Sequence, residues 1–303
     1  MCEISAKGIR KSYGKTEALK GIDLNVDKGE LFGVIGPDGA GKTSLIRILT
    51  TLILADEGQA EVDGLDVVSD YKKLRTRLGY MPGKFSLYGD LTVKENLELF
   101  ASLFGTTIKA NYDLIKDIYE RLEPFESRRA AKLSGGMKQK LALCCALIHS
   151  PIALFLDEPT TGVDPSSRRE FWDMLRKLKQ RGITIFVSTA YMDEATRCDR
   201  IALMSEGTFL KTGTPEHIIS EFGEALLAVR SDEMFRLLGD LRKIEGVRSC
   251  YTFGCFHHIT TDDKTLADRL PAALSVDYHH KGVCVERIKA SVEDCYMNLT
   301  LER

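Results

Sequence analysis

The chain has 303 residues, of which 44% are hydrophobic and 28% charged, a balance typical of a folded protein with room for about two domains. Its formal net charge is −2 at pH 7, so it has no overall basic field to hold DNA or RNA, and nucleic acid is not the expected partner. The longest apolar runs, such as residues 141–148, are far shorter than the ~20 residues of a membrane-spanning helix.

The first seven residues lack the basic-then-apolar pattern of a secretory signal, and none of the eight cysteines forms a CxxC pair. Both features predict a cytoplasmic protein with reduced thiols. Residues 4–11 and 19–26 alternate in polarity, which predicts two strands separated by a turn at Gly14.

A glycine-rich loop follows a short apolar run. Residues 30–35 have the length of a buried strand, residues 36–43 read Gly-Pro-Asp-Gly-Ala-Gly-Lys-Thr, and residues 44–54 have helical apolar spacing. A strand, a GxxxxGK[ST] loop and a helix in this order are the context of a phosphate loop, whereas the alternative is a glycine turn without a ligand.

The loop predicts a site for ATP and Mg²⁺. Gly39 and Gly41 let backbone N–H groups turn toward the β- and γ-phosphates, and the positive end of the next helix points the same way. Lys42 adds a charge, and the Thr43 hydroxyl is a ligand for Mg²⁺. The expected ATP-binding residues of this segment are Gly36, Pro37, Asp38, Gly39, Ala40, Gly41, Lys42, Thr43 and Ser44.

The middle of the chain predicts a helical insertion and then more strands. Thr92 and Glu95 have the spacing of a capping box, and residues 92–148 contain no convincing strand, so we expect a helical subdomain at about residues 90–150. Apolar runs at 152–156 and 183–188 predict buried strands joined by a helix at 166–181. This alternation predicts an α/β fold, a parallel sheet with helices on its faces.

Two acidic residues end the first of those strands. Asp157 would emerge at the carboxyl edge of the sheet, where α/β proteins bind ligands, and could hold Mg²⁺ together with Thr43. Glu158 comes directly after it. The alternative for the pair is two solvated loop acids.

Three motifs together resemble a known family. After the glycine loop come Leu133-Ser-Gly-Gly-Met-Lys-Gln139 and then Leu154-Phe-Leu-Asp-Glu158, in the order found in the ATP-binding subunit of an ABC transporter, and the resemblance covers about residues 3–220. It implies the P-loop ABC cassette fold and ATPase activity, with Glu158 as the general base. Tyr13 lies where the family stacks an aromatic on adenine, although a lone surface tyrosine is the alternative.

The resemblance also implies partners. In the family, the segment Ser134, Gly135 and Gly136 closes on the γ-phosphate held by the opposite subunit of a head-to-tail dimer, so the chain would need a second ABC cassette. Membrane permease subunits would be the other partner, which places the chain peripherally on the inner face of the cell membrane.

Three positions depart from the family pattern. A glutamine is usual where this chain has Gly83, a histidine where it has Ala190, and an asparagine where it has Asp38. Loss of two γ-phosphate sensors beside intact Lys42 and Glu158 predicts a site that binds ATP and hydrolyses it poorly, while Ser134 can still complete a partner's site.

A second unit is expected from residue 223, giving domains at 1–222 and 223–303. Residues 225–288 predict the order βαββαβ of a ferredoxin-like α+β sandwich: strand 225–230, helix 232–244, hairpin 247–261, helix 264–274 and strand 283–288. Residues 291–300 are similar to the closing helix of the C-terminal domain of drug- and polysaccharide-exporter ABC ATPases. The resemblance implies a regulatory or dimerisation domain.

Cysteines and histidines are frequent in this second unit. The set could hold Zn²⁺ in a tetrahedral site, or it could be ordinary core and surface residues of a sheet, because adjacent histidines on a strand point to opposite faces. Its members are Cys250, Cys255, His257, His258, His279, His280 and Cys284.

The sequence therefore predicts the ATP-binding subunit of an ABC-type exporter that binds Mg-ATP and drives a separate permease. One alternative is a soluble ABC-type ATPase acting on ribosomes or DNA, although such proteins usually carry two cassettes or a coiled-coil insertion. The other is a regulatory module that binds ATP without hydrolysing it, against which Glu158 argues.

Overall fold

The computed structural model describes residues 2–301, which form two compact units, the first ending at Pro215 and the second beginning at Glu216. This boundary lies before the one expected at residue 222. The reason is α7 (Pro215–Ser220), which packs with the second unit. Ile218 is buried, and its carbonyl oxygen accepts a hydrogen bond of 3.6 Å from the Cys295 thiol of α10 (Val292–Leu301).

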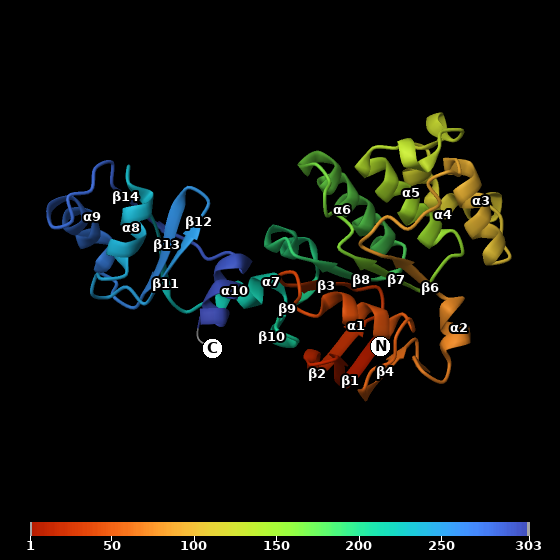
Figure 1. The fold of residues 1–303 in the computed structure, drawn as a ribbon, viewed down its shortest axis with the longest axis horizontal. Coiled ribbons are helices and arrows are strands. Elements are labelled where there is room, and N and C mark those ends of the chain that lie inside the picture. Colours follow the sequence, from red (N-terminus) through yellow and green to blue (C-terminus); the bar gives the residue numbers. More distant parts are fainter. Residues whose placement is uncertain (1, 302–303) are drawn as a thin grey trace. The chain divides into compact units, whose positions relative to one another are not determined.

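A six-stranded sheet forms the centre of the first unit (Figure 1). Its strands, in spatial order, are β10 (Thr208–Gly213), β9 (Arg200–Ser205), β3 (Leu31–Ile35), β8 (Thr184–Thr189), β7 (Ala153–Asp157) and β6 (Leu78–Met81). All neighbours are parallel except β9 and β10. Every residue of β3, β7 and β8 is buried, so their continuous apolar runs reflect helices or sheet on both faces.

A second, antiparallel sheet lies on one side of the first, with α1 (Lys42–Leu49) between the two (Figure 1). Its strands, in spatial order, are β2 (Thr16–Asp27), β1 (Cys2–Tyr13), β4 (Glu57–Val62) and β5 (Leu65–Asp66), and α2 (Tyr71–Arg75) follows them. The predicted β1–β2 hairpin is confirmed. The helix after the glycine loop is shorter than expected, because Thr51 has a φ of 63° and the N–H groups of the next two residues turn back to the Arg47 carbonyl.

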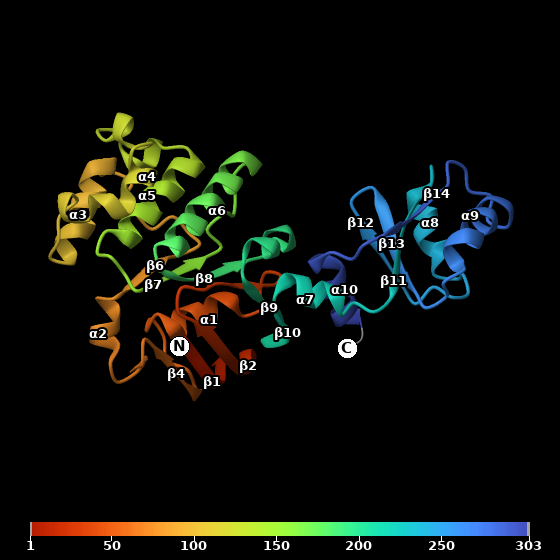
Figure 2. The ribbon, with the colours of Figure 1, turned by 180° about the vertical axis from the view of Figure 1, so that it is seen from behind.

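Helices cover the other face of the six-stranded sheet (Figure 2). They are α3 (Val93–Leu103), α4 (Tyr112–Tyr119), α5 (Gly135–Leu147) and α6 (Pro165–Gln180), with short turns η1 (Lys109–Asn111), η2 (Glu123–Phe125), η3 (Ala130–Lys132) and η4 (Met192–Arg197). The capping box of α3 is confirmed: Glu95 N–H donates to Thr92 Oγ1 at 3.2 Å, and Thr92 N–H donates to Glu95 Oε2 at 2.7 Å. The helical insertion predicted for residues 92–148 is therefore present.

The second unit has the predicted ferredoxin-like topology. Its elements in chain order are β11 (Ala225–Arg230), α8 (Met234–Leu241), β12 (Ser249–Phe253), β13 (Phe256–Thr261), α9 (Leu266–Val276), β14 (Cys284–Ile288) and α10. The strands are antiparallel in the order β12-β13-β11-β14. Leucines of α8 and α9 share a core with one sheet face, and α10 contacts the other face through a 2.9 Å hydrogen bond from Tyr251 to Asp294.

Candidate nucleotide site

The glycine loop follows β3 and requires glycine at two positions. An ideal Cβ on Gly36 would lie 2.2 Å from the Met204 carbonyl oxygen. Gly41 has a φ of 109°, and a Cβ there would lie 2.4 Å from the Ala18 carbonyl oxygen. Any side chain at either position would collide with a neighbouring strand, so the loop can approach β9 and β2 closely only with glycine. Pro37, Asp38 and Gly39 are exposed at its tip, whereas Ala40 is buried beneath it.

Lys42 begins α1 and folds back over the loop. Its side chain is 2% exposed, and its Nζ donates hydrogen bonds to the carbonyl oxygens of Gly36 at 2.7 Å and Pro37 at 2.9 Å. The same Nζ lies 3.0 Å from Glu158 Oε1. All three ammonium donors therefore have acceptors, and a phosphate oxygen that reaches Lys42 would replace one of them.

Thr43 and Asp157 face each other across the base of the loop. Thr43 Oγ1 donates to Asp157 Oδ1 at 3.0 Å, and the Asp157 side chain, at the end of β7, is buried. A hydroxyl and a carboxylate are the hard oxygen ligands that Mg²⁺ takes beside substrate phosphates. The donor set therefore fits a magnesium ion held partly by the protein. Among residues 2–301 no cluster of three or more His, Cys, Asp or Glu side chains has the arrangement of an all-protein metal cage.

Ser188 orients both acidic residues, a role that the sequence analysis missed. Its Oγ donates to Asp157 Oδ1 at 2.7 Å and accepts from the Glu158 N–H at 3.1 Å. Ser188 lies opposite Asp157 in the parallel β7–β8 pair. The available signal was the polar end of the apolar run at 183–188, because the carboxyl ends of adjacent parallel strands meet at one sheet edge.

Glu158 is held in an unusual backbone conformation. Its φ of 49° lies in the left-handed region that non-glycine residues seldom adopt, and such strain is concentrated at functional sites. Its side chain is 23% exposed, and Oε2 accepts a hydrogen bond from Thr161 Oγ1 at 3.4 Å. The carboxylate is thus directed toward the loop while still reachable by solvent.

These residues meet around a hollow of about 250 Å³ at the carboxyl edge of the sheet. Its lining residues include Tyr13, Gly39, Gly41, Lys42, Thr43, Ser44 and Glu158. Tyr13, 47% exposed, ends β1, and its hydroxyl lies 3.4 Å from Ser44 Oγ. The structure therefore brings the predicted aromatic, the loop and the predicted base to one place.

The segment Ser134–Gly136 does not line this hollow. Ser134 caps α5 by accepting a hydrogen bond from the Met137 N–H at 3.4 Å, and both Ser134 and Gly135 are exposed. A Cβ on Gly136 would lie 2.9 Å from Ser167 Oγ of α6, which explains the glycine there. The start of α5 is thus an exposed helix N-terminus that lies outside the hollow at the chain's own glycine loop.

Two of the three departures from the family pattern lie beside the acidic pair. An ideal Cβ on Gly83 would lie 2.9 Å from the Asp157 carbonyl oxygen, so any side chain at position 83 requires a small shift of the backbone. Ala190 follows β8 directly and offers no polar atom. The third, Asp38, is exposed at the tip of the loop.

The cysteines and histidines of the second unit have hydrogen-bonding and packing roles. His257 and His258 point to opposite faces of the sheet, as expected: His257 Nε2 contacts the Met234 carbonyl oxygen at 2.7 Å, and His258 Nδ1 contacts Asp294 Oδ1 at 2.6 Å. His280 Nε2 lies 3.2 Å from Asp240 Oδ2. Each of these three histidines has a local polar partner, and no group of three or more His, Cys, Asp or Glu side chains within the described residues is arranged to hold a metal ion.

Most thiols with described side chains are buried. Cys144 and Cys145 are buried residues of α5. Cys198 packs against Gly33, and an ideal Cβ on Gly33 would lie 2.7 Å from the Cys198 sulfur. Burial raises the pKa of these three thiols and raises that of Cys250 to about 11, which makes them poor nucleophiles at neutral pH. Cys255, in the turn between β12 and β13, is exposed.

Comparisons with known proteins agree with this geometry. The sequence profile of the ABC transporter family matches residues 19–161. The probable multidrug ABC transporter ATP-binding protein YbhF of Escherichia coli (strain K12) is 42% identical over 217 residues, which are 71% of this chain and 38% of YbhF. The chain therefore spans well under half the length of that relative.

Another relative is similar over almost the whole chain. The Nod factor export ATP-binding protein I of Burkholderia lata is 34% identical over 303 residues, covering 98% of this chain and 96% of that protein. Among solved structures, an ATP-binding subunit of an ABC transporter matches with a TM-score of 0.66 and 28% identity, over 73% of this chain and 93% of that one. A dimeric ATP-binding cassette bound to ADP and Pi matches with a TM-score of 0.63 and 26% identity, over 70% and 98%.

No helix within residues 2–301 has the length and hydrophobicity to cross a membrane. The loop, the acidic pair and the exposed start of α5 occur in one cassette fold, and the sequence similarity extends across both units. The chain belongs to the family of ABC transporter ATP-binding proteins.

Proposed function

We propose that the chain is the ATP-binding subunit of an ABC exporter and that it binds Mg-ATP in the hollow beside Tyr13. The single observation that carries this proposal is the meeting of Lys42, Thr43 and Asp157 with Glu158 at the carboxyl edge of one sheet. Membership of the family implies ATPase activity, and this cluster supplies one group for each task of phosphoryl transfer to water.

Each side chain has a distinct task in the proposed reaction. Lys42 would exchange a loop carbonyl or Glu158 for phosphate oxygens, and Thr43 with Asp157 would hold Mg²⁺, which neutralises charge on the β and γ oxygens. Glu158, released from Lys42, would accept the proton of the attacking water. Ser188 would keep Asp157 and the Glu158 backbone in place throughout.

A head-to-tail dimer with a second cassette is the arrangement that uses Ser134. Its helix presents bare N–H groups at an exposed end outside the chain's own hollow, and helix N-termini bind phosphate oxygens. The dimeric relative bound to ADP and Pi supports this part of the proposal. ATP would close the dimer by contacts with both subunits, and hydrolysis would remove the γ-phosphate contacts.

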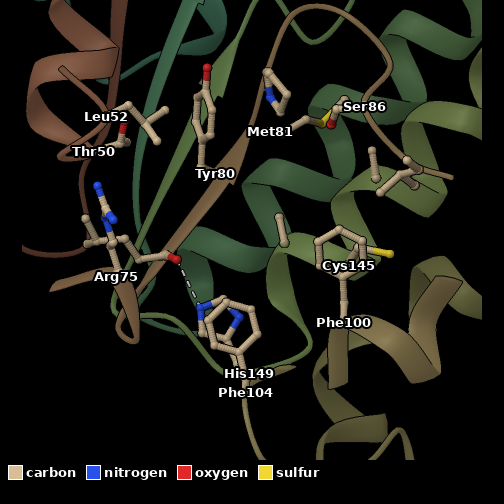
Figure 3. Close-up of a pocket in the computed structure, with 15 residues that line it drawn as sticks. Thr50, Leu52, Arg75, Tyr80, Met81, Ser86, Phe100, Phe104, Cys145 and His149 are labelled. Atoms are coloured by element: carbon tan, nitrogen blue, oxygen red, sulfur yellow. Dashed lines mark hydrogen bonds between the residues drawn. The ribbon is translucent and has the colours of Figure 1, made fainter. Parts of the chain in front are cut away.

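The proposed permease site is an apolar groove of about 350 Å³ between β6 and the helices α3 and α5 (Figure 3). Phe100 of α3 and Phe104, which directly follows that helix, line it, and Phe104 stacks on His149, with ring centroids 3.8 Å apart. His149 Nε2 lies 3.0 Å from the Leu78 carbonyl oxygen, which joins the end of α5 to β6. Ser86 and Leu87, in the segment between β6 and α3, complete the groove.

This groove suits an amphipathic helix of a membrane subunit, because its apolar lining offers burial and the Arg75 guanidinium at its edge offers one charged contact. Docking there would place the chain peripherally at the inner face of the membrane. Transport outward is inferred from relatives named for multidrug transport and Nod factor export.

We expect the isolated chain to bind Mg-ATP but to hydrolyse it more slowly than about 1 s⁻¹, which is below the turnover of an ordinary transporter. The reason is that the side chains of Gly83 and Ala190 cannot hold the attacking water and the γ-phosphate. The pair Gly83→Gln and Ala190→His should raise turnover by roughly tenfold. Purified protein would be assayed for ATP binding and phosphate release.

The matched control adds bulk without polar groups, as Gly83→Ala with Ala190→Leu, and should not raise turnover. The gain from Gly83→Gln alone should be smaller than that from Ala190→His, since a side chain at position 83 must displace the Asp157 carbonyl region. Turnover of 1 to 10 s⁻¹ by the unmodified isolated chain would contradict the idea of a weak site.

For the second unit we propose a role in regulation or dimer assembly. Its β12 edge, residues 249–253, carries no charged residue and no proline, whereas the opposite edge strand β14 carries Glu286 and Arg287. Charged edges resist pairing and uncharged ones permit it. Pairing between copies of this unit would therefore use β12.

A chain ending at Thr214 is expected to fold and to bind ATP with a Kd within about twofold of the full chain, because the nucleotide residues and their core lie in the first unit. The end is placed before α7 because α7 packs with the second unit. Circular dichroism would check folding, and a titration would check affinity. A folded truncated chain that had lost ATP affinity would assign the second unit to the nucleotide site.

A further inference from the structure

A buried carboxylate joins three segments at the edge of the nucleotide site. Glu194, in η4, is 3% exposed. Its Oε2 accepts hydrogen bonds from Thr189 Oγ1 at 2.6 Å and Thr160 Oγ1 at 3.1 Å. Its Oε1 accepts one from Arg168 Nε at 3.1 Å. Both oxygens of a charge that is hidden from water are thus satisfied by protein groups.

Each donor comes from a segment with a task in the proposed reaction. Thr160 is two residues after Glu158, the proposed base. Thr189 ends β8 and precedes Ala190, where the family has its γ-phosphate histidine. Arg168 lies in the first turn of α6, whose N-cap is Asp164.

The same cluster extends to the start of α5. An ideal Cβ on Gly135 would lie 3.7 Å from the Gly162 carbonyl oxygen, so the segment 158–164 packs directly against the helix that begins at Ser134. The loop that carries Glu158 therefore touches the end that would serve the partner's nucleotide. In the proposed dimer, a single anchor for this loop would act on both composite sites.

Arg168 strengthens the anchor through further contacts. Its Nη2 lies 3.3 Å from Asp193 Oδ1, and its guanidinium lies 4.0 Å from the centre of the Tyr191 ring. The Tyr191 N–H donates to Thr189 Oγ1 at 3.0 Å. Buried charges are stable only with their partners in place, so this network permits few arrangements of the turn after β8.

We propose that Glu194 is a positioning residue for ATP hydrolysis, which holds the Glu158–Asp164 loop in a fixed relation to the end of β8. This inference rests on the proposed function. Ser188 already ties the Glu158 backbone to β8, and the Glu194 network adds a second connection, from Thr189 beside the γ-phosphate position at Ala190 to Thr160 in the loop that carries the base. Its action is through the loop, since Glu194 does not line the nucleotide hollow.

The test is Glu194→Gln, which keeps the shape but replaces one acceptor oxygen by an NH₂ group that cannot accept from Thr or Arg. We expect kcat to fall by about tenfold to a hundredfold, the loss that follows a misplacement of about 1 Å. The Kd for ATP should stay within about twofold. Backbone amides of residues 160–164 should exchange hydrogen faster than in the unmodified chain, a readout that needs no turnover.

Glu30→Gln is the matched control. Glu30 is also buried, at 7% exposure, and pairs with Arg200 at 3.3 Å, but it precedes β3 at the end opposite the glycine loop. This variant should lose about as much thermal stability as Glu194→Gln while keeping kcat and the hydrogen exchange of residues 160–164 unchanged. If Glu194→Gln fails to fold, Thr160→Val removes one donor with little change in volume and should give the same changes on a smaller scale.

The measurements distinguish a failure of the proposed ATPase function from a failure of the positioning role of Glu194. If the unmodified chain hydrolyses ATP no faster than its Glu158→Gln variant, Glu158 is not the base that the proposed function requires. The hydrogen-exchange measurement would still decide whether Glu194 positions the loop. If hydrolysis depends on Glu158 but kcat is unchanged in Glu194→Gln, Glu194 does not position the loop. Unchanged hydrogen exchange at residues 160–164 would overturn the positioning role as well. If Glu30→Gln lowers kcat and speeds the exchange to the same extent, the role of Glu194 is to stabilise the fold and not to position the loop.

Discussion

Ser134→Arg is expected to lower the ATPase of the chain, assembled with its permease and partner cassette, by about a hundredfold or more. The exposed N-cap of α5 would close on the partner's γ-phosphate, and a long cationic side chain there would obstruct the donors that stabilise the transition state. Phosphate release by the reconstituted complex is the measurement. Ser127→Arg, at an exposed position of the same subdomain, is the control and should leave the rate unchanged.

The contrast with Lys42→Ala tests the asymmetry of the two sites. If this chain's own site is the weak one, because Gly83 and Ala190 lack sensor groups, then removing Lys42 should leave a substantial fraction of the complex's activity. Equal losses from Ser134→Arg and Lys42→Ala would mean that the two composite sites are equivalent, and the proposed division between a strong and a weak site would be wrong.

Glu158→Gln should reduce the chain's own turnover by about 10²- to 10⁴-fold, the contribution of a general base. Glutamine is nearly isosteric, so the left-handed backbone and the Thr161 contact can persist, while the removed charge no longer competes with phosphate for Lys42. ATP binding should therefore be retained or become tighter. Single-turnover hydrolysis and equilibrium binding would separate the two effects.

Glu120→Gln serves as the control for this substitution, because Glu120 is half-exposed and pairs only loosely with Lys116 at 3.7 Å. A Glu158→Gln rate within about threefold of the unmodified rate would show that Glu158 is not the base. An unmodified rate no higher than the background of the assay would instead favour the alternative of a module that binds ATP without hydrolysing it.

Much of the fold was predictable because its signals are local. The strand, loop and helix around Lys42, the capping box at Thr92 and Glu95, and the βαββαβ order of the second unit all depend on short-range patterns. The opposite orientation of His257 and His258 follows from the period of a strand. The end of α1 carried no such signal, since Thr51 adopts its left-handed φ without the usual glycine.

The site was predictable as a set of residues but not as a set of contacts. Motif order selects Lys42, Asp157 and Glu158, yet the pairing of Lys42 with Glu158 depends on two loops meeting at one sheet edge. Glu194 belongs to no motif used in the sequence analysis, and its donors come from three separate segments. Interactions of this kind become visible only when the strand order brings those segments together.

Few of the thiols within residues 3–301 are accessible to labelling reagents. Of the seven thiols with described side chains, five are buried, Cys284 is half-exposed and Cys255 is exposed. Maleimide and disulfide reagents attack exposed thiolates, so the turn at Cys255 should react first. With Cys2, Cys255 and Cys284 changed to serine, a new cysteine at residue 134 could serve as a cross-linking probe of the partner cassette, and the five buried thiols could be left in place.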